Sequence, residues 1–397
     1  NMAITLDSQL CEAYAGRGCA KHKLGDHKGA FSDFSKALAL NPRSKYAFIK
    51  RALLKTDLGD YEGALADYNA VQRIDPNEYL AYFYRAEIKH ELGDIQGAIN
   101  DYTACIRIDP DDPDAYCNRA NLLQRQGKLD AAEKDYKKAR QLDPDSEIVN
   151  HNKAVNDLKM GNTQEAFQEF GHALQNDLDD FRTFNNRGVA LKELGRYDEA
   201  LADLNTALRI KPKYVEARLN RAFVDWHKEQ FDNAMADLSM AVTLEPSRAR
   251  GYQYRALIKK QLGDIAGAID DCTLALKIEP HNIDCLIGRG DMYLISSGNK
   301  HIKDALRDYD TILRLDSNNY VAYQRRGQAK VKAEDAKGGL LDADKAIALN
   351  PDYAEAYVTR ASAKHSLGDD TGALSDVEHA LQLDPDSFTA QFVASSI

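Results

Sequence analysis

Prolines recur at a fixed spacing of 34 residues, and this spacing constrains the fold more than any other feature of the sequence. Those in register are Pro42, Pro76, Pro110, Pro144, Pro212, Pro246, Pro280, Pro351 and Pro385. The intervals are 34 residues or multiples of it, except that Pro280 and Pro351 lie 71 residues apart, which is two periods plus three. A fixed period of about 20 to 50 residues indicates a repeat array. The chain of 397 residues is therefore not expected to divide into ordinary globular domains.

The stretch from Phe181 to Pro212 shows what one period contains: two short amphipathic helices joined by a tight turn. Gly195 ends the first helix, at a place where a left-handed residue is common, and Pro212 stops the second. The second helix has the apolar spacing of one buried stripe, formed by Ala200, Leu201, Leu204, Ala207 and Leu208. Such a pair cannot bury both of its faces alone, so it needs neighbours.

In this register, residues 11–387 contain eleven repeats. They start at Cys11, Lys45, Tyr79, Pro113, Glu147, Phe181, Val215, Ala249, Ile283, Tyr320 and Ala354. The eighth position is Gly or Ala in every repeat, and the twentieth is Ala in every repeat except at Gly339. The pattern resembles the tetratricopeptide repeat (TPR) family, whose unit is a helix–turn–helix of about 34 residues. The resemblance implies an all-α fold, an α-solenoid that winds as a right-handed superhelix of antiparallel helix pairs.

The two ends and one insertion depart from the regular array. Residues 1–10 resemble the close of a preceding second helix, and residues 388–397 begin a further or capping helix. Neither end shows the polar-faced cap of a finished solenoid, so we expect the chain to be a fragment of a longer one. The repeat from Ile283 holds three extra residues within 296–301, which we interpret as an enlarged turn, with a docking loop as the alternative.

A basic residue at the seventh position and an acidic residue at the twenty-third recur in every repeat. The bases are Arg17, Arg51, Arg85, Arg119, Lys153, Arg187, Arg221, Arg255, Arg289, Arg326 and Arg360, and the acids are Asp33, Asp67, Asp101, Asp135, Glu169, Asp203, Asp237, Asp271, Asp308, Asp342 and Asp376. We infer an ion pair that joins the two helices of each repeat, or one repeat to the next. An arginine ladder for anionic ligands is the alternative, but an acid in every repeat would neutralise it.

Charge and cysteine usage limit the classes of partner. The net charge of -10 and pI near 5.5 argue against a nucleic-acid-binding or anionic-membrane surface. There is no run of 18 apolar residues, so we expect no membrane insertion. The six cysteines have no C-x-x-C spacing, and most fall on predicted helices. We interpret them as reduced packing residues and expect a cytoplasmic protein.

Sequence motifs of catalysis are missing. There is no H-E-x-x-H, G-x-x-x-x-G-K-[ST], G-x-S-x-G or G-x-G-x-x-G pattern, and the ten histidines form no ligand pairs at helical spacing. The segment 109–114 looks superficially like a calcium loop but lacks the required glycine and glutamate, so we interpret it as a turn with a helix cap. We expect no catalytic residue, no metal site and no cofactor.

Four successive repeats carry asparagine at the sixth position: Asn118, Asn152, Asn186 and Asn220. The resemblance implies that the first helices line a concave face and that positions 2, 5, 6, 9, 12 and 13 point into it. Asparagine offers a donor and an acceptor, so a ladder of this kind can clamp the backbone of an extended peptide. It is similar to the asparagine ladder in the TPR arm of O-linked N-acetylglucosamine transferase. The alternative is that asparagine merely suits a polar groove.

Further residues on the implied concave face could add selectivity for side chains: Asn121, Asn185, Arg182, Arg125, Lys192 and Trp226, the last as an aromatic anchor or a packing residue. The carboxylate clamp of TPR co-chaperones is matched best by Cys117, Asn121, Asn152, Arg182 and Asn186. Two of the three cations of that clamp are absent, which counts against it.

The sequence favours a non-catalytic scaffold or adaptor that binds an extended segment of another protein in its groove. One alternative is the substrate-recognition arm of a larger enzyme similar to O-GlcNAc transferase. Others are a co-chaperone and an architectural component of a large assembly such as a cilium. The partner and the oligomeric state do not follow from the sequence.

Overall fold

The computed structural model describes residues 4, 7, 9–176, 179–296 and 301–397. These residues form α-helices and connecting turns, without a strand. The chain divides into two compact units, Asn1–Arg196 and Tyr197–Ile397, and each is described by itself. The six cysteines are free thiols and all but Cys19 are buried, as expected of packing residues. No helix in the described ranges combines the length and the apolar character that crossing a membrane requires.

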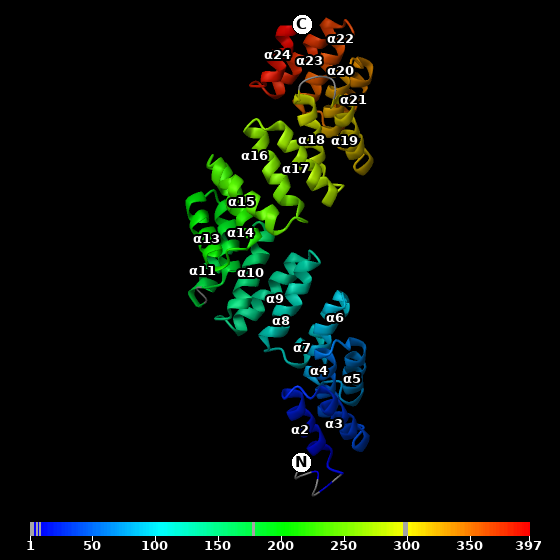
Figure 1. Cartoon of the computed structure of the whole chain (residues 1–397). Helices are drawn as coiled ribbons and strands as arrows, with labels where there is room; N and C mark the ends of the chain where they lie inside the picture. The colour runs from blue at the N-terminus through cyan, green and yellow to red at the C-terminus, as the bar shows by residue number, and fades with distance from the viewer. Residues whose placement is uncertain (1–3, 5–6, 8, 177–178, 297–300) are drawn as a thin grey trace. The chain divides into compact units, whose positions relative to one another are not determined.

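Each unit is built from consecutive helices (Figure 1). In the first unit they are α2 (Cys11–Lys23), α3 (His27–Leu40), α4 (Lys45–Asp57), α5 (Tyr61–Ile74), α6 (Tyr79–Glu91), α7 (Ile95–Ile108), α8 (Pro113–Arg125), α9 (Leu129–Leu142), α10 (Glu147–Met160), α11 (Thr163–Asn176) and α12 (Phe181–Glu193). In the second they are α13 (Tyr197–Ile210), α14 (Val215–His227), α15 (Phe231–Leu244), α16 (Ala249–Gln261), α17 (Ile265–Ile278), α18 (Ile283–Ile295), α19 (Ile302–Leu315), α20 (Tyr320–Lys332), α21 (Ala336–Leu349), α22 (Ala354–Ser366), α23 (Asp370–Leu383) and α24 (Phe388–Ser396).

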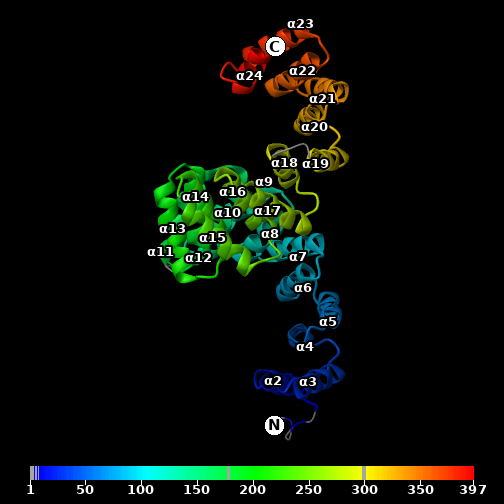
Figure 2. The same cartoon turned by 45° about the horizontal axis from the view of Figure 1, so that its top comes forward.

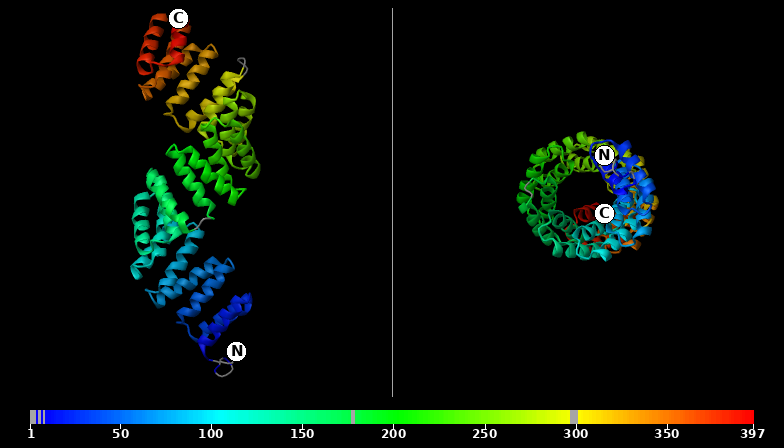
Figure 3. Two further views of the ribbon diagram at one scale, coloured as in Figure 1. Left: turned by 90° about the vertical axis from the view of Figure 1, so that its left-hand side faces the viewer. Right: turned by 90° about the horizontal axis from the view of Figure 1, so that it is seen from below.

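Neighbours in sequence are neighbours in space within each unit. An even-numbered helix packs antiparallel on the odd-numbered helix that follows it, as α2 does on α3 and α20 on α21 (Figure 2). Even-numbered helices also contact one another, for example α2 with α4 and α20 with α22. Figure 3 shows this pairing from two further directions. The architecture is the predicted all-α solenoid of helix pairs.

Small residues let the two helices of a pair approach closely. A Cβ at Gly290 would lie 2.7 Å from the ring of Tyr309, and one at Gly18 would lie 2.7 Å from the ring of Phe34. Both rings are fully buried. In these two repeats the small residue at the eighth position therefore makes room for an aromatic side chain of the second helix, because a packed interior leaves no space for both.

A repeated cap starts six of the second helices. The caps are Asp26, Asp60, Asp94, Asp264, Asp335 and Asp369. Each carboxylate accepts a hydrogen bond from the backbone N–H three residues later, as Asp60 does from Gly63 at 2.9 Å. A Cβ on Gly63 would come within 2.1 Å of the Asp60 carboxylate, so glycine at that site preserves the cap.

The turn inside most pairs is held by a glycine in the left-handed region, such as Gly59 with φ +77°. Glu229 and Glu334 occupy the same kind of turn with φ values of 58° and 65°. A side chain in this conformation is strained, at a cost of about 1–2 kcal/mol per residue. These two turns are therefore weak points in otherwise regular pairs.

Replacing Glu229 by glycine is expected to raise the free energy of unfolding by about 0.5–1 kcal/mol, because the relief of strain exceeds the entropy that glycine gains in the unfolded chain. Urea denaturation followed by circular dichroism measures the change. Glu229→Ala is the control, since it removes the same charge but keeps the strained Cβ. A glycine variant no more stable than the alanine variant would contradict this account.

Some predicted features fall where the structure gives no description. Of the enlarged turn at 296–301, residues 297–300 lie outside the described residues, and only Ser296 and His301 border it. Of the predicted end of a preceding helix at 1–10, residues 1–3, 5–6 and 8 also lie outside them. Residues 388–396 form α24, with Phe388 and Phe392 exposed.

Candidate functional site

The recurring bases and acids form ion pairs between the two helices of a pair. In nine helix pairs, each of which lies wholly within one of the two units, the arginine donates from Nε and Nη2 to the two carboxylate oxygens of one buried aspartate. The pairs are Arg17–Asp33, Arg51–Asp67, Arg85–Asp101, Arg119–Asp135, Arg221–Asp237, Arg255–Asp271, Arg289–Asp308, Arg326–Asp342 and Arg360–Asp376. The predicted pairing within a repeat is confirmed for these nine. Arg187 and Asp203 belong to different units.

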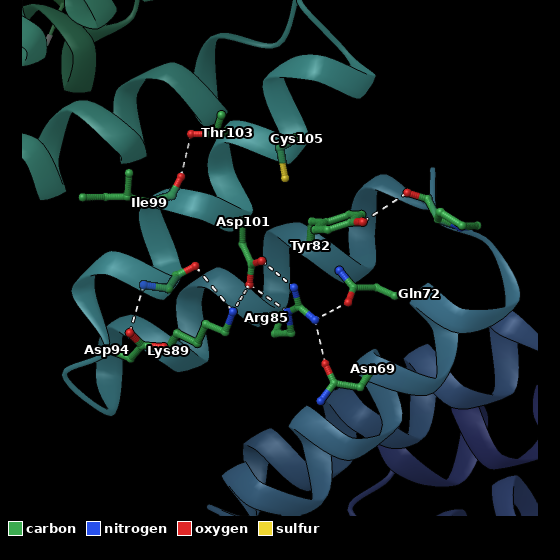
Figure 4. A network of polar contacts seen from close by, with 12 residues as sticks. Asn69, Gln72, Tyr82, Arg85, Lys89, Asp94, Ile99, Asp101, Thr103 and Cys105 are labelled. Carbon is green, nitrogen blue, oxygen red and sulfur yellow. Dashed lines mark hydrogen bonds and ion pairs between the residues drawn. The ribbon is translucent and has the colours of Figure 1, made fainter.

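The arginine also reaches the preceding helix pair. Figure 4 shows Arg85 bonded to Asp101, while its Nη1 donates to Asn69 Oδ1 at 2.6 Å. The ring of Tyr82 lies 5.4 Å from the guanidinium carbon, a cation–π contact. Comparable Nη1 bonds lead from Arg51, Arg119, Arg221, Arg289, Arg326 and Arg360. One side chain therefore ties together both helices of its own pair and the pair before it.

Sequence reasoning missed a third member of this network, a lysine four residues after the arginine. Lys89 Nζ lies 2.8 Å from Asp101 Oδ2 (Figure 4). The same contact is made by Lys21, Lys55, Lys259, Lys330 and Lys364. The signal was available, since these lysines recur at one position of the repeat. Each buried aspartate accepts hydrogen bonds from its arginine and, in several repeats, from a second cation as well. The arginines therefore stabilise the fold and do not form a ladder for external anions.

Three predicted ladder residues lie in the first unit, on α8, α10 and α12, and Asn220 lies on α14 of the second. Asn118, Asn152 and Asn186 are half-buried, whereas Asn220 is only 9% exposed. Asn152 Nδ2 lies 3.7 Å from Cys117 Sγ, and Asn186 Nδ2 lies 3.5 Å from His151 Nε2. Neither contact uses an amide oxygen.

Two pockets border these asparagines within the first unit. A pocket of about 270 Å³ is lined by His90, Tyr102, Asn118, Asn121, Leu122, Gln124, Arg125 and Asn152. A pocket of about 400 Å³ is lined by Glu147, Ile148, His151, Asn152, Ala173, Asp180, Arg182 and Thr183. The structure therefore brings Asn118, Asn121 and Asn152 together in one pocket and joins Asn152 to Arg182 in the next. We call the surface of α8, α10 and α12 around these two pockets the groove face.

Other predicted site residues support their neighbours. Asn121 Oδ1 accepts a hydrogen bond of 2.6 Å from the buried Tyr136 hydroxyl. Asn185 is 3% exposed and donates to Asn186 Oδ1 at 3.0 Å. In the second unit the half-buried Trp226 donates from Nε1 to Gln261 Oε1 at 2.7 Å and packs against the core. These contacts hold the side chains in place and occupy hydrogen-bonding groups that the sequence analysis had assigned to a ligand.

His151, which the sequence analysis did not select, lines the second pocket. Its Nδ1 is 2.5 Å from Thr183 Oγ1, and its ring meets Phe170 edge-on. Burial lowers the pKa of His151 despite the opposing charge of Asp180, so the ring is neutral near pH 7. Among the described residues, no group of three histidine, cysteine, aspartate or glutamate side chains could hold a metal ion. The pockets offer hydrogen bonds and charge, which suit recognition of a ligand.

Family profiles match several stretches of the chain. A profile described as TPR repeat matches residues 86–127, and three described as tetratricopeptide repeat match 15–79, 113–146 with 181–214, and 354–387. A search of curated protein sequences found no significant match.

Solved structures with a similar fold include the APC/C hetero-tetramer Cut9-Hcn1, at 14% identity over 99% of this chain and 90% of that chain, with a TM-score of 0.51. A tetratricopeptide repeat protein from Parabacteroides merdae is 20% identical over 63% of this chain and 98% of its own, with a TM-score of 0.48. Yeast Tom70 is 15% identical over 95% of this chain and 98% of its own, with a TM-score of 0.45. With its helix pairs, its small residues at the pair interfaces and these profile matches, the chain belongs to the tetratricopeptide repeat family.

Proposed function

We propose that this chain is a non-catalytic scaffold whose eleven repeats, residues 11–387, present a groove for an extended segment of another protein. The observation that carries the proposal is the placement of Asn118 and Asn152 in one pocket, where neither amide oxygen accepts a hydrogen bond from another described residue. They occupy the same position of successive repeats, on α8 and α10. We further propose that the protein acts in the cytoplasm, which fits its free thiols.

An amide side chain suits recognition of a backbone. Each asparagine can accept from one peptide N–H and donate to one peptide C=O, and an extended segment offers both groups at every residue other than proline. Asn185 donates a hydrogen bond to the Asn186 side-chain amide, and His151 on the first helix of the preceding repeat contacts the same amide. Side chains held in this way lose little rotamer freedom when a ligand binds, which favours affinity.

The test is selection of random 12-residue peptides against the whole chain, followed by measurement of the Kd of the selected peptides. We expect Asn118→Ala, Asn152→Ala and Asn186→Ala to weaken binding about threefold to tenfold each, since a net hydrogen bond contributes about 0.5–1.5 kcal/mol. Asn100→Ala and Asn233→Ala are matched controls, because both asparagines are exposed on second helices. Equal affinity in parent and groove variants would remove the asparagine ladder from the proposal.

The alternative roles differ in how well this surface supports them. The recognition arm of a larger enzyme and an architectural component would use the same groove, so the peptide test does not depend on choosing between them. The co-chaperone role has less support. Cys117, which stands where the carboxylate clamp requires a lysine, is buried and contacts Asn152. A clamp for a terminal carboxylate therefore lacks a charge at that place.

A further inference from the structure

Arg125 and Lys159 lie on the groove face and form no ion pair with an acid among the described residues. Arg125 lies at the end of α8, and its Nη1 atom is within hydrogen-bond distance of His90 Nε2 on α6. Lys159 on α10 donates from Nζ to Gln124 Oε1 at 2.9 Å. They stand at the same position of successive repeats, and both are exposed. The arginines that support the fold behave differently, since each of them holds a buried aspartate. Arg125 and Lys159 instead contact a histidine ring and a glutamine amide, so no carboxylate among the described residues neutralises their charge.

The pocket beside Arg125 is rich in donors. It is the pocket of about 270 Å³ described above, and its polar lining consists of His90, Tyr102, three asparagines, Gln124 and Arg125, without a carboxylate. Asn118 and Asn152 are among its lining residues, and their side-chain amides carry N–H donors. Gln124 bridges the two helices, since its Nε2 lies 3.4 Å from the Asn152 carbonyl oxygen while its Oε1 holds Lys159. The pocket thus combines one guanidinium, several amide donors and a nearby ammonium group.

We propose that this pocket binds the carboxylate of an aspartate or glutamate side chain in the segment that occupies the groove. The inference rests on the proposed function and adds a preference to it. A guanidinium presents two parallel N–H groups that match the two oxygens of a carboxylate, and such charge-assisted bonds are stronger than neutral ones. To bind, Arg125 exchanges its contact with the His90 ring for one with an anion, while Lys159 strengthens the local positive field.

The remaining cations of the groove face do not form a second site of this kind. Arg182 lines the neighbouring pocket, but Glu147 and Asp180 line it as well. An incoming carboxylate there would meet like charges, which disfavours it. The preference for an acidic residue is therefore expected at one place along the bound segment, next to the residues clamped by Asn118 and Asn152.

The experiment uses the peptides selected against the whole chain. We expect aspartate or glutamate to be enriched at one position of the selected sequences. For a selected peptide, the R125Q/K159Q double variant should bind about tenfold or more weakly, in line with the loss of a charge-assisted contact. K134Q/K138Q on the second helix α9 removes the same charge as a control, and we expect it to change the Kd less than twofold.

A double-mutant cycle then locates the contact. Changing the enriched acidic residue of the peptide to its amide should weaken binding to the parent chain by a similar factor, but should leave binding to R125Q/K159Q nearly unchanged. Independent, additive losses would overturn the assignment. A phosphoserine peptide that binds the parent chain where the glutamate peptide does not would show that the anion is a phosphate and overturn the carboxylate assignment.

The same data separate this inference from the proposed function. If peptides are selected and lose affinity in the asparagine variants, but show no coupling to Arg125 and Lys159, only the carboxylate pocket is wrong. If no peptide is selected by the parent chain, the peptide groove and the pocket both fail.

Discussion

Replacing Asp342 by alanine is expected to lower the free energy of unfolding by about 3–5 kcal/mol, whereas Asp310→Ala should cost only about 0–1 kcal/mol. Both carboxylates bond to Arg326, and each lies 2.7 Å from one of its terminal nitrogens. They differ in burial, because the side chain of Asp342 is 7% exposed and that of Asp310 is 54% exposed. The two substitutions therefore compare a buried and an exposed partner of the same guanidinium.

The larger cost arises from what Asp342 leaves behind. Its Oδ2 atom also lies 2.8 Å from Lys330 Nζ, so its loss takes the buried carboxylate away from two partly buried cations and leaves Arg326 only the exposed Asp310. An arginine guanidinium keeps its proton at neutral pH, so Arg326 cannot relieve the cost by losing its charge. Asp310 is open to water, which replaces its bond to Arg326. Urea denaturation of the whole chain, followed by circular dichroism, compares the two variants, and equal losses would show that burial does not govern these pairs.

Much of the fold could be predicted because the same residue types recur at the same positions in successive repeats. A single Gly or Ala on a helix says little, but a small residue at one place in every repeat implies a close approach of two helices. The structure shows the aromatic ring that needs this space, as at Gly290 and Tyr309. The Arg–Asp pairs could be predicted for the same reason, since base and acid recur together. A single residue of this kind would be weak evidence, but its recurrence in every repeat predicts a specific contact between the two helices of a pair.

The site could be predicted less well, because it depends on how one pair is rotated against the next. Asn185 and Asn186 are adjacent in sequence, yet the first is buried and the second half-buried, since successive residues of a helix point about 100° apart. The contact of Arg125 with His90 joins residues 35 positions apart, from different repeats. Such a contact requires the stacking geometry, which the repeat pattern alone does not give.

The repeat from Glu147 shows a different limit of the pattern. The predicted partners Lys153 and Glu169 lie 3.6 Å apart, but the hydrogen bond of Lys153 Nζ goes to Asp157 on its own helix, at 2.7 Å. Glu133 on the preceding helix is also 3.6 Å from this nitrogen, and Arg140 bonds to Glu169. A lone ion pair was expected, whereas the structure has one buried lysine among three carboxylates. A lysine lacks the fork of an arginine, so it does not pair with one acid in the same way.

Lys153→Met is expected to lower the free energy of unfolding by about 3–5 kcal/mol at pH 7, because it leaves Asp157 and its neighbours buried without this cation. The side chains of Lys153 and Asp157 are 7% and 3% exposed. Burial alone would lower the pKa of Lys153, but the bond to Asp157 and the surrounding carboxylates raise it overall. The stability that this lysine contributes is therefore fully present below its ordinary pKa of 10.5, which includes neutral pH. Lys134→Met is the matched control, since it makes the same substitution at an exposed site on α9.

The cost of Lys153→Met should also depend on pH in a defined direction. Without the ammonium group, a carboxylate that stays charged in the buried site of the variant lacks its counter-charge, and protonating it relieves that cost. This relief grows as the pH falls into the acid range and is complete only below the ordinary carboxyl pKa of about 4, where the folded and unfolded chains are both protonated. The difference in unfolding free energy between parent and variant should therefore narrow from pH 7 to pH 5, while that of Lys134→Met stays small throughout. Methionine fills most of the volume of lysine and carries no charge, so little of the lost stability should come from packing. A loss of stability that is the same at both pH values would contradict this and assign the loss to packing.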